Sequence, residues 1–360
     1  MNNTIPKLPF DFDLESKAVL KKTASARSAL AEMKGAAASI PNESILISTL
    51  SLQEAKDSSA IENIITTHDD LYQSDFENRR FKSLASKEVH SYAQALTGGF
   101  RTVKEQGFIS IKDILKIQAT IEENEAGFRK VPGTALKNEQ TGEVVYTPPQ
   151  HIDEIRELMG NLEQFMNDQS MNDWDPLVKM AVIHHQFESI HPFYDGNGRT
   201  GRIINILYLV KEGLLSLPIL YLSRYINQNK ADYYRLLQKV RDENAWEEWV
   251  MYMLNGIEQT SLQTIEVIQG IKTLMLKHKR TMRLQTKIYS QDLLNNLFRH
   301  PYTKIDFVQK ELDISRPTAT KYLEELTAVG ILRKEKMGRD NYYINTDLFN
   351  LLSNVNPSRL

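Results

Sequence analysis

The sequence has no cysteine, and this absence excludes three kinds of chemistry at once. A chain without thiols cannot form disulfides, bind zinc through thiolates or use a cysteine nucleophile. The absence also fits a reducing compartment, so we expect a cytoplasmic protein.

The sequence also lacks long apolar runs and a strong net charge. No apolar stretch is long enough to span a membrane, and the N-terminus has no basic start followed by an apolar segment. We therefore expect neither export nor a membrane partner. The chain carries 44 basic and 46 acidic residues, a formal net charge of -2. This balance gives no global attraction to nucleic acid or anionic lipid, so such binding would need a local patch.

What is present is a chain of globular composition with mainly helical patterning. Hydrophobic residues make up 41% and charged residues 25% of the sequence, close to the globular average. The 360 residues predict two or three folded units. Apolar residues recur at helical spacing, for example over residues 152–166. Val144, Val145 and Tyr146 follow a turn region at residues 140–142 and predict a short hairpin. We expect a mainly α fold.

Two strongly apolar helices flank one polar loop. Asp175 and Pro176 predict the start of a helix that runs to Ile190 and is apolar on almost every side. A second apolar helix is predicted from about Arg199 and ends at Gly213. Both helices should be buried, so the polar residues between them need a functional reason to lie in a core.

Two histidines on the first of these helices have a structural interpretation. His184 and His185 have no carboxylate or thiolate partner at metal-ligand spacing. We therefore expect them to be hydrogen-bonded members of the core.

The loop carries residues suited to binding an anion. Residues 191–202 are His-Pro-Phe-Tyr-Asp-Gly-Asn-Gly-Arg-Thr-Gly-Arg. Gly196 and Gly198 allow the backbone to approach an anion closely, and the helix that follows offers free N–H groups and a positive dipole end. Arg199 and Arg202 are three residues apart, so both can reach one phosphate chain.

The same loop also carries a candidate metal ligand and a candidate base. Asp195 could hold Mg²⁺ that bridges phosphates, because magnesium prefers one or two carboxylates plus phosphate oxygens. His191 lies at the mouth of the loop, where an imidazole with an ordinary pKa of about 6.5 could take a proton from a hydroxyl group. The alternative is an ordinary interhelical turn in which Asp195 pairs with Arg199.

At these residues the chain resembles the Fic (filamentation induced by cAMP) family, whose signature is His-Pro-Phe-x-Asp/Glu-Gly-Asn-Gly-Arg-x-x-Arg. Every defined position is matched, and the resemblance covers roughly residues 5–260. It implies a protein adenylyltransferase with ATP as substrate and Mg²⁺ as cofactor. His191 would deprotonate a Ser, Thr or Tyr hydroxyl of a target protein, or of the chain itself. That hydroxyl would attack the α-phosphorus, take AMP and expel pyrophosphate.

The resemblance also implies a fold and further roles. The fold would be a Fic-type helical bundle with a short β-hairpin flap, formed by Val144, Val145 and Tyr146, that aligns the target by strand addition. Phe193 would hold the loop in the core, and Asp195 would bind Mg²⁺. The residues implied to bind ATP are Gly196, Asn197, Gly198, Arg199 and Arg202, with Asn197 at the transferred phosphate, and Tyr233 and Tyr234 at the base pocket.

A helix near residues 54–64 carries a candidate inhibitory motif. Residues Ser58 to Asn63 match the family's inhibitory pattern Ser/Thr-x-x-x-Glu-Gly/Asn. Ser58 and Glu62 are four apart and share a helix face. We expect a bidentate pair between Glu62 and Arg202, which would leave ATP bound in an unreactive pose. The alternative is a surface helix with a solvated Glu62.

The C-terminal part predicts a different unit. Two short helices, over residues 303–311 and 315–329, have helix-turn-helix spacing, and two strands at 332–337 and 342–344 follow. The unit therefore resembles a winged helix domain. Residues 301–345 hold eight basic and seven acidic side chains, so the electrostatic attraction to DNA is small. DNA binding and protein contact both remain open.

We therefore expect four regions: an N-terminal helical region at 1–100, a Fic core at 101–260, a linker helix at 261–287 and a winged helix domain at 288–360. Family members often form homodimers, which the resemblance extends to this chain. Two other functions remain open, namely a nucleotide-sensing DNA-binding regulator and an enzyme that removes AMP. The presence of His191 favours catalysis, because a sensor needs the phosphate contacts but no base.

Overall fold

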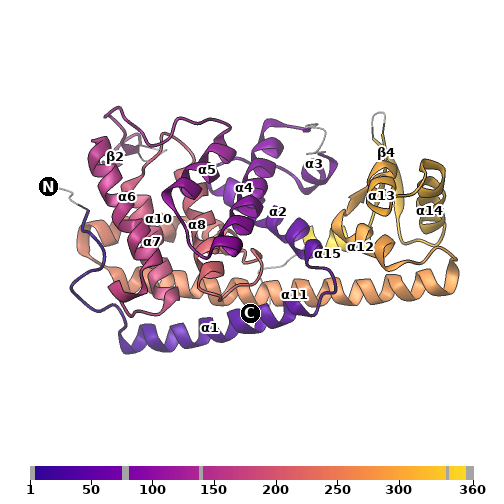
Figure 1. Ribbon diagram of the computed structural model, residues 1–360, viewed down its shortest axis with the longest axis horizontal. Helices are drawn as coiled ribbons and strands as arrows, with labels where there is room; N and C mark the ends of the chain where they lie inside the picture. The colour runs from indigo at the N-terminus through magenta and orange to yellow at the C-terminus, as the bar shows by residue number, and fades with distance from the viewer. Residues whose placement is uncertain (1–4, 75–80, 138–140, 338–339, 354–360) are drawn as a thin grey trace.

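The computed structural model describes residues 5–74, 81–137, 141–337 and 340–353. Helices account for most of these described residues, and two small antiparallel sheets complete the regular structure among them (Figure 1). The expected mainly α fold is confirmed. Part of the turn expected at 140–142 lies outside the described residues.

Two long helices lie side by side along one edge of the molecule (Figure 1). Helix α1 (Lys17–Ala38) packs along α11 (Trp246–Gln285), which has 40 residues. The linker helix expected at 261–287 is the second half of α11, because the apolar pattern continues without a break from Trp246. None of the helices in the described ranges combines the length and apolar character that a membrane crossing requires.

Two buried helices form the centre of the larger body. Every residue of α7 (Pro176–Ile190) from Leu177 onward is buried, and most of α8 (Asn197–Lys211) is buried as well. Asp175 caps α7 by accepting from the Leu177 N–H at 2.8 Å. Around this pair lie α2 (Glu43–Ile61), α4 (Leu84–Gln106), α5 (Ile111–Glu122) and α6 (Ile152–Asn167). The polar loop predicted between two core helices therefore connects α7 and α8, and the four other helices surround it.

Smaller elements close the body on its remaining sides. Strands β1 (Leu136–Lys137) and β2 (Val144–Tyr146) pair antiparallel, which confirms the predicted hairpin. The other elements are α3 (His68–Gln73), the 3-10 helix η1 (Gln169–Met171), α9 (Leu222–Gln228) and α10 (Lys230–Glu243).

The C-terminal unit contains the predicted pair of short helices followed by strands. Its elements are α12 (Gln291–Arg299), β3 (Tyr302–Thr303), α13 (Ile305–Leu312), α14 (Arg316–Ala328), β4 (Arg333–Met337), β5 (Asp340–Ile344) and α15 (Thr346–Ser353). The sheet order is β3-β5-β4, so β3 is a third strand that the sequence did not predict. Several basic side chains pair with acids of the same unit: Arg316 with Asp306, Lys334 with Glu324, and Arg333 with Glu335.

The C-terminal unit also contacts the short helix α3 of the larger body. The Tyr342 hydroxyl donates to the Gln73 carbonyl at 2.9 Å, and the Tyr302 hydroxyl donates to Asp69. The rings of Tyr72 and Tyr302 stack at a centroid distance of 6.0 Å. These contacts tie the two parts of the chain together through α3, which also bonds to Gln53 of α2.

Candidate active site

The loop between α7 and α8 begins and ends with a left-handed residue. His191 has φ 47° and caps α7, with its N–H donating to the Phe187 carbonyl at 3.0 Å. Gly196 has φ 75° and immediately precedes α8. A positive φ is uncommon for a non-glycine residue and is often found at functional sites. The two turns place His191 and the N-terminus of α8 on the same short loop.

The loop is fixed from inside by Phe193 and Asn197. The Phe193 side chain is fully buried and packs against the rings of Phe128 and Phe187. The Asn197 amide accepts from the Phe193 N–H and donates to the Phe193 carbonyl, both at 2.9 Å. Both polar ends of the Asn197 side chain thus hold the loop backbone, a contact that the sequence did not predict.

The His191 imidazole lies in an environment that keeps it neutral. Burial, together with the positive charges of Arg129 and Arg241, lowers its pKa to about 4. The Arg129 Nε also donates to the His191 carbonyl at 2.8 Å, which fixes the backbone at this point. At neutral pH the ring therefore has a free lone pair that can accept a proton.

Glu62, at the end of α2, bridges the two arginines of α8. Its Oε1 accepts from Arg202 Nη2 and its Oε2 from Arg199 Nε, each at 2.7 Å. The expected contact between Glu62 and Arg202 is present. The prediction that both Glu62 oxygens bind Arg202 is wrong, because the second oxygen binds Arg199. The two guanidinium groups lie on one face of α8, so each takes one carboxylate oxygen. The side chain of Glu62 is 25% exposed, so it is not the solvated surface residue of the alternative interpretation.

Ser58 and Asn63, the other two residues of the candidate inhibitory motif, lie in different environments. The Ser58 hydroxyl accepts from Arg202 Nε at 2.7 Å, and the Ser58 carbonyl accepts from Arg202 Nη2 at 3.0 Å. Asn63 follows α2 with φ 62°. Gly and Asn tolerate this left-handed conformation best, which gives a physical reason for a motif that ends in either residue.

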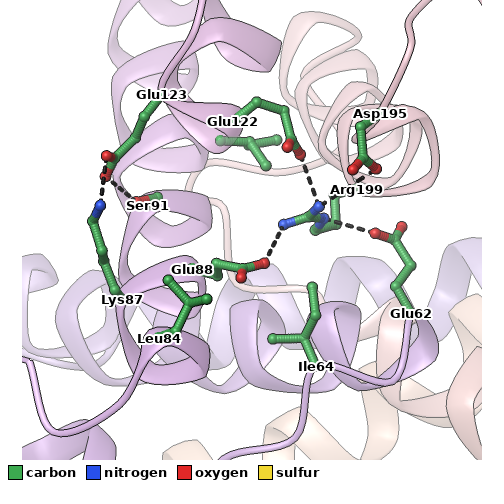
Figure 2. A pocket seen from close by; sticks show the side chains of 11 residues that line it. Glu62, Ile64, Leu84, Lys87, Glu88, Ser91, Glu122, Glu123, Asp195 and Arg199 are labelled. Atoms are coloured by element: carbon green, nitrogen blue, oxygen red, sulfur yellow. Dashed lines mark hydrogen bonds and ion pairs between the residues drawn. The ribbon is translucent and has the colours of Figure 1, made fainter.

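Two further glutamates contact Arg199, and sequence reasoning missed both. Glu88 of α4 lies 3.2 Å from Arg199 Nη1, and Glu122 of α5 lies 2.7 Å from Nη2. Figure 2 shows these carboxylates and Glu62 converging on one guanidinium group. They line a cavity of about 430 Å³ together with Ile64, Leu84, Lys87, Ser91, Ile121, Glu123 and Asp195.

Asp195 is the one acidic residue of the loop at 191–202, and it is exposed. Its side chain is 77% exposed, and Oδ1 accepts from the Gly196 N–H at 2.7 Å. The same oxygen lies 4.0 Å from Arg199 Nη2, farther than the glutamates. The shorter contacts of Arg199 therefore go to residues distant in sequence, and the loop is more than a local pair of Asp195 with Arg199.

The hairpin is attached beside His191. The Tyr146 hydroxyl donates to the Ser189 carbonyl in the last turn of α7 at 3.0 Å. The Arg241 guanidinium lies 3.9 Å from the centre of the Tyr146 ring. Val144 and Val145 are half exposed, so β2 is fixed at one end and open at the other.

Tyr233 and Tyr234 lie in contrasting environments on α10. Tyr233 is buried, and its hydroxyl is 2.9 Å from His184 Nε2, whereas Tyr234 is 49% exposed. Neither is among the described residues that line the cavity beside Arg199. His185 Nε2 lies 3.2 Å from the Leu237 carbonyl, so the expected core role of both histidines is confirmed.

Comparison with known families agrees with this architecture. The model described as Fic/DOC family N-terminal matches residues 20–101, and the Fic/DOC family model matches residues 108–209. A third, described as protein adenylyltransferase SoFic-like, C-terminal domain, matches residues 274–348. The chain belongs to the Fic/DOC family. The matched Fic segment contains α5 to α7, the whole loop that carries His191, and α8 except for its last two residues.

Curated relatives align with the Fic chain over part of their length. The chain is 30% identical over 140 residues to the protein adenylyltransferase fic-1 of Caenorhabditis briggsae, which covers 37% of this chain and 24% of that one. It is 28% identical over 158 residues to the protein adenylyltransferase Fic of Aedes aegypti, covering 44% and 30%. The chain thus spans about a quarter of the length of these relatives.

Solved structures share the Fic fold. A Fic family protein from Desulfovibrio desulfuricans superimposes with a TM-score of 0.58 at 19% identity, covering 95% of this chain and 98% of that chain. Fic-1 from Caenorhabditis elegans gives a TM-score of 0.54 at 21% identity, covering 69% and 71%. The arrangement of helices is therefore that of the Fic family.

Proposed function

We propose that this chain is a protein adenylyltransferase that transfers AMP from ATP to Ser, Thr or Tyr hydroxyl groups of proteins, including itself. The observation that carries the proposal is a neutral imidazole, His191, on the same short loop as the N-terminus of a helix that bears two buried arginines. The names of the curated relatives, which match over the same segment, support it.

The start of α8 would bind the phosphates of ATP. A Cβ atom at Gly198 would lie 2.6 Å from Glu62 Oε1, and one at Gly196 would lie 2.5 Å from Glu122 Oε1. Both glycines therefore let anionic oxygens approach the backbone at a helix N-terminus, where free N–H groups and the dipole favour negative charge. Phosphate oxygens would take the place of these carboxylates and bind Arg199 and Arg202.

His191 would act as the general base. The neutral imidazole takes the proton of the target hydroxyl, whose oxygen forms a bond to the α-phosphorus of ATP. The bond between the α-phosphorus and the bridging oxygen to the β-phosphate breaks, and pyrophosphate leaves with its electron pair. The proton passes from His191 to solvent after the transfer.

Asp195 would hold Mg²⁺. Its carboxylate is exposed and lines the cavity, and magnesium prefers few protein carboxylates plus phosphate and water oxygens. Within the described ranges no group of three or more candidate ligands is present, so most of the ligands would come from ATP and water. The ion would neutralise part of the phosphate charge.

Glu62 would inhibit the transfer by occupying both arginines. While its two oxygens bind Arg199 Nε and Arg202 Nη2, these two nitrogen atoms would not be available to a phosphate oxygen. ATP would then bind in an unreactive pose or bind weakly. Ser58 would add to this effect, because its hydroxyl accepts a hydrogen bond from Arg202 Nε.

The hairpin would bind the target protein, and the two tyrosines of α10 would lie at the nucleotide base. Strand β2 offers the backbone of Val144 and Val145 for strand addition by a target segment, next to the Tyr146 contact that fixes it near His191. Tyr233 would support the base pocket from the core, and the exposed Tyr234 would contact the base.

Intact-protein mass spectrometry tests the proposed reaction. The Glu62→Gly protein, incubated with ATP and Mg²⁺, is expected to gain the mass of one or more AMP groups. The Glu62→Gly, His191→Ala double variant is the control and should gain none. An unchanged mass, or the addition of phosphate alone, would contradict AMP transfer.

The pH dependence of transfer provides a second test. Because the pKa of His191 is about 4, the base is unprotonated throughout the range of about pH 6 to 8. The kcat/KM of the Glu62→Gly protein is therefore expected to stay flat over that range and to fall as the pH approaches 4. A fall centred near the ordinary histidine pKa of about 6.5 would contradict a desolvated His191.

A further inference from the structure

Arg199 is held by three glutamates that come from three different helices. Besides Glu62 on Nε, Glu122 accepts from Nη2 at 2.7 Å and Glu88 from Nη1 at 3.2 Å (Figure 2). The side chain of Arg199 is only 4% exposed, and that of Glu122 is 14% exposed. Each nitrogen of the guanidinium group thus already donates to a carboxylate.

The charges around the two arginines do not favour a phosphate chain. Arg199 and Arg202 supply two positive charges, whereas Glu62, Glu88, Glu122 and Asp195 supply four negative charges within 4.0 Å of them. Removal of Glu62 alone leaves three negative charges against two positive ones. Arg202 loses its carboxylate partner in that case, but Arg199 keeps Glu88 and Glu122, with Asp195 at 4.0 Å.

Glu122 also lies against the backbone where a phosphate would be stabilised. A Cβ atom at Gly196, the residue before α8, would lie only 2.5 Å from Glu122 Oε1. The N–H groups of the first helical turn and the positive end of the helix dipole act on any anion there. Burial raises the pKa of Glu122, and Asp195, Glu62 and Glu88 raise it further, while Arg199 opposes them. Among these influences, the charge of Arg199 is the one that favours the ionised carboxylate.

We propose that Glu122, assisted by Glu88, is a second determinant of nucleotide binding that competes with the phosphates for Arg199 whether or not Glu62 is in place. This inference rests on the proposed function only in taking ATP as the ligand. It assigns the site two acidic competitors outside the inhibitory motif, on helices α4 and α5. Release of Glu62 then opens the site only in part, since Arg199 is freed at Nε alone.

The test is the affinity for ATP with Mg²⁺, measured by isothermal titration calorimetry. The Glu62→Gly, Glu122→Gln protein is expected to bind ATP about tenfold more tightly than Glu62→Gly, a factor that corresponds to the loss of one competing hydrogen bond between charged groups. The matched control is Glu123→Gln in the same background. Glu123 lines the same cavity but pairs with Lys87 at 2.6 Å, so affinity should stay within about twofold of Glu62→Gly.

The opposite result would mean that Glu122 orients Arg199 for phosphate instead of competing with it. Unchanged or weaker binding by the Glu122→Gln double variant would therefore overturn the proposal. If thermal melting shows that this variant does not fold, Glu88→Gln in the Glu62→Gly background replaces it, with an expected gain of about threefold because its contact is longer. If the Glu88→Gln substitution does not increase the affinity for ATP, the proposal is overturned as well.

Transfer of AMP is measured on the same proteins, so that two failures can be told apart. Tighter binding without transfer in any variant would leave this inference standing and remove the proposed function. If Glu62→Gly transfers AMP but the added Glu122→Gln substitution does not change the affinity for ATP, the proposed function stands and this inference is overturned.

Discussion

Replacement of His191 with Ala in the Glu62→Gly protein is expected to abolish AMP transfer while ATP binding stays within about twofold. A positioned general base contributes roughly 10²–10⁴-fold to a rate, and His191 is the neutral imidazole on the loop that we propose binds the phosphates. It takes part in none of the described ion pairs of Arg199 and Arg202, the two side chains that we propose bind the phosphates. Transfer is measured with labelled ATP, and binding is measured by calorimetry.

Two further variants make this experiment decisive. His191 has a positive φ, which Ala adopts less readily than Asn, so His191→Asn removes the base with less backbone strain. His151 is an exposed histidine before α6 whose side chain makes no capping bond, and His151→Ala should leave transfer unchanged. Transfer by either His191 variant above about a tenth of the parent rate would rule out a base at this position.

The second large expected effect is an increase in AMP transfer when Glu62 is replaced. Glu62→Gly is expected to raise self-labelling with ATP at least about tenfold over the wild type, since loss of even one strong charge contact corresponds to about that factor. The substitution frees Arg202 Nη2 and Arg199 Nε, which Glu62 holds at 2.7 Å each. Incorporation of label is followed over time at a fixed ATP concentration.

Ser58 and Glu43 offer graded comparisons on the same helix. Ser58→Ala removes the hydroxyl contact to Arg202 Nε but keeps Glu62, so a smaller gain is expected. Glu43 lies exposed in the first turn of α2, far from the arginines, and Glu43→Gln should label like the wild type. Equal labelling of Glu62→Gly and the wild type would show that the bridge does not restrain the reaction.

The features that were predictable from the sequence are local ones. The cap of Asp175 and the proline after it set the start of α7, and the all-round apolar pattern of residues 177–190 marks a buried helix. The loop that follows carries its histidine, glycines and arginines in one unbroken stretch. Local hydrogen bonding and periodicity decide such elements, so one sequence is enough to place them.

The features that were missed depend on how distant helices meet. Glu88 and Glu122 belong to no motif, and only the packing of α4 and α5 beside α8 brings them to Arg199. The bridging geometry of Glu62 has the same origin, because it depends on where α2 ends relative to α8. Asn197 shows a further limit, since its amide could bind a ligand or the loop, and the backbone of Phe193 takes both of its ends.

The central claim is that the loop between α7 and α8 binds a triphosphate with a proton acceptor beside it. A crystal structure of the Glu62→Gly protein with Mg²⁺ and a non-hydrolysable ATP analogue tests this most directly. We expect the phosphates at the N-terminus of α8, in contact with Arg199 and Arg202, and the His191 ring facing the α-phosphate. Phosphates bound elsewhere, with the loop empty and the imidazole turned away from the nucleotide, would contradict the account.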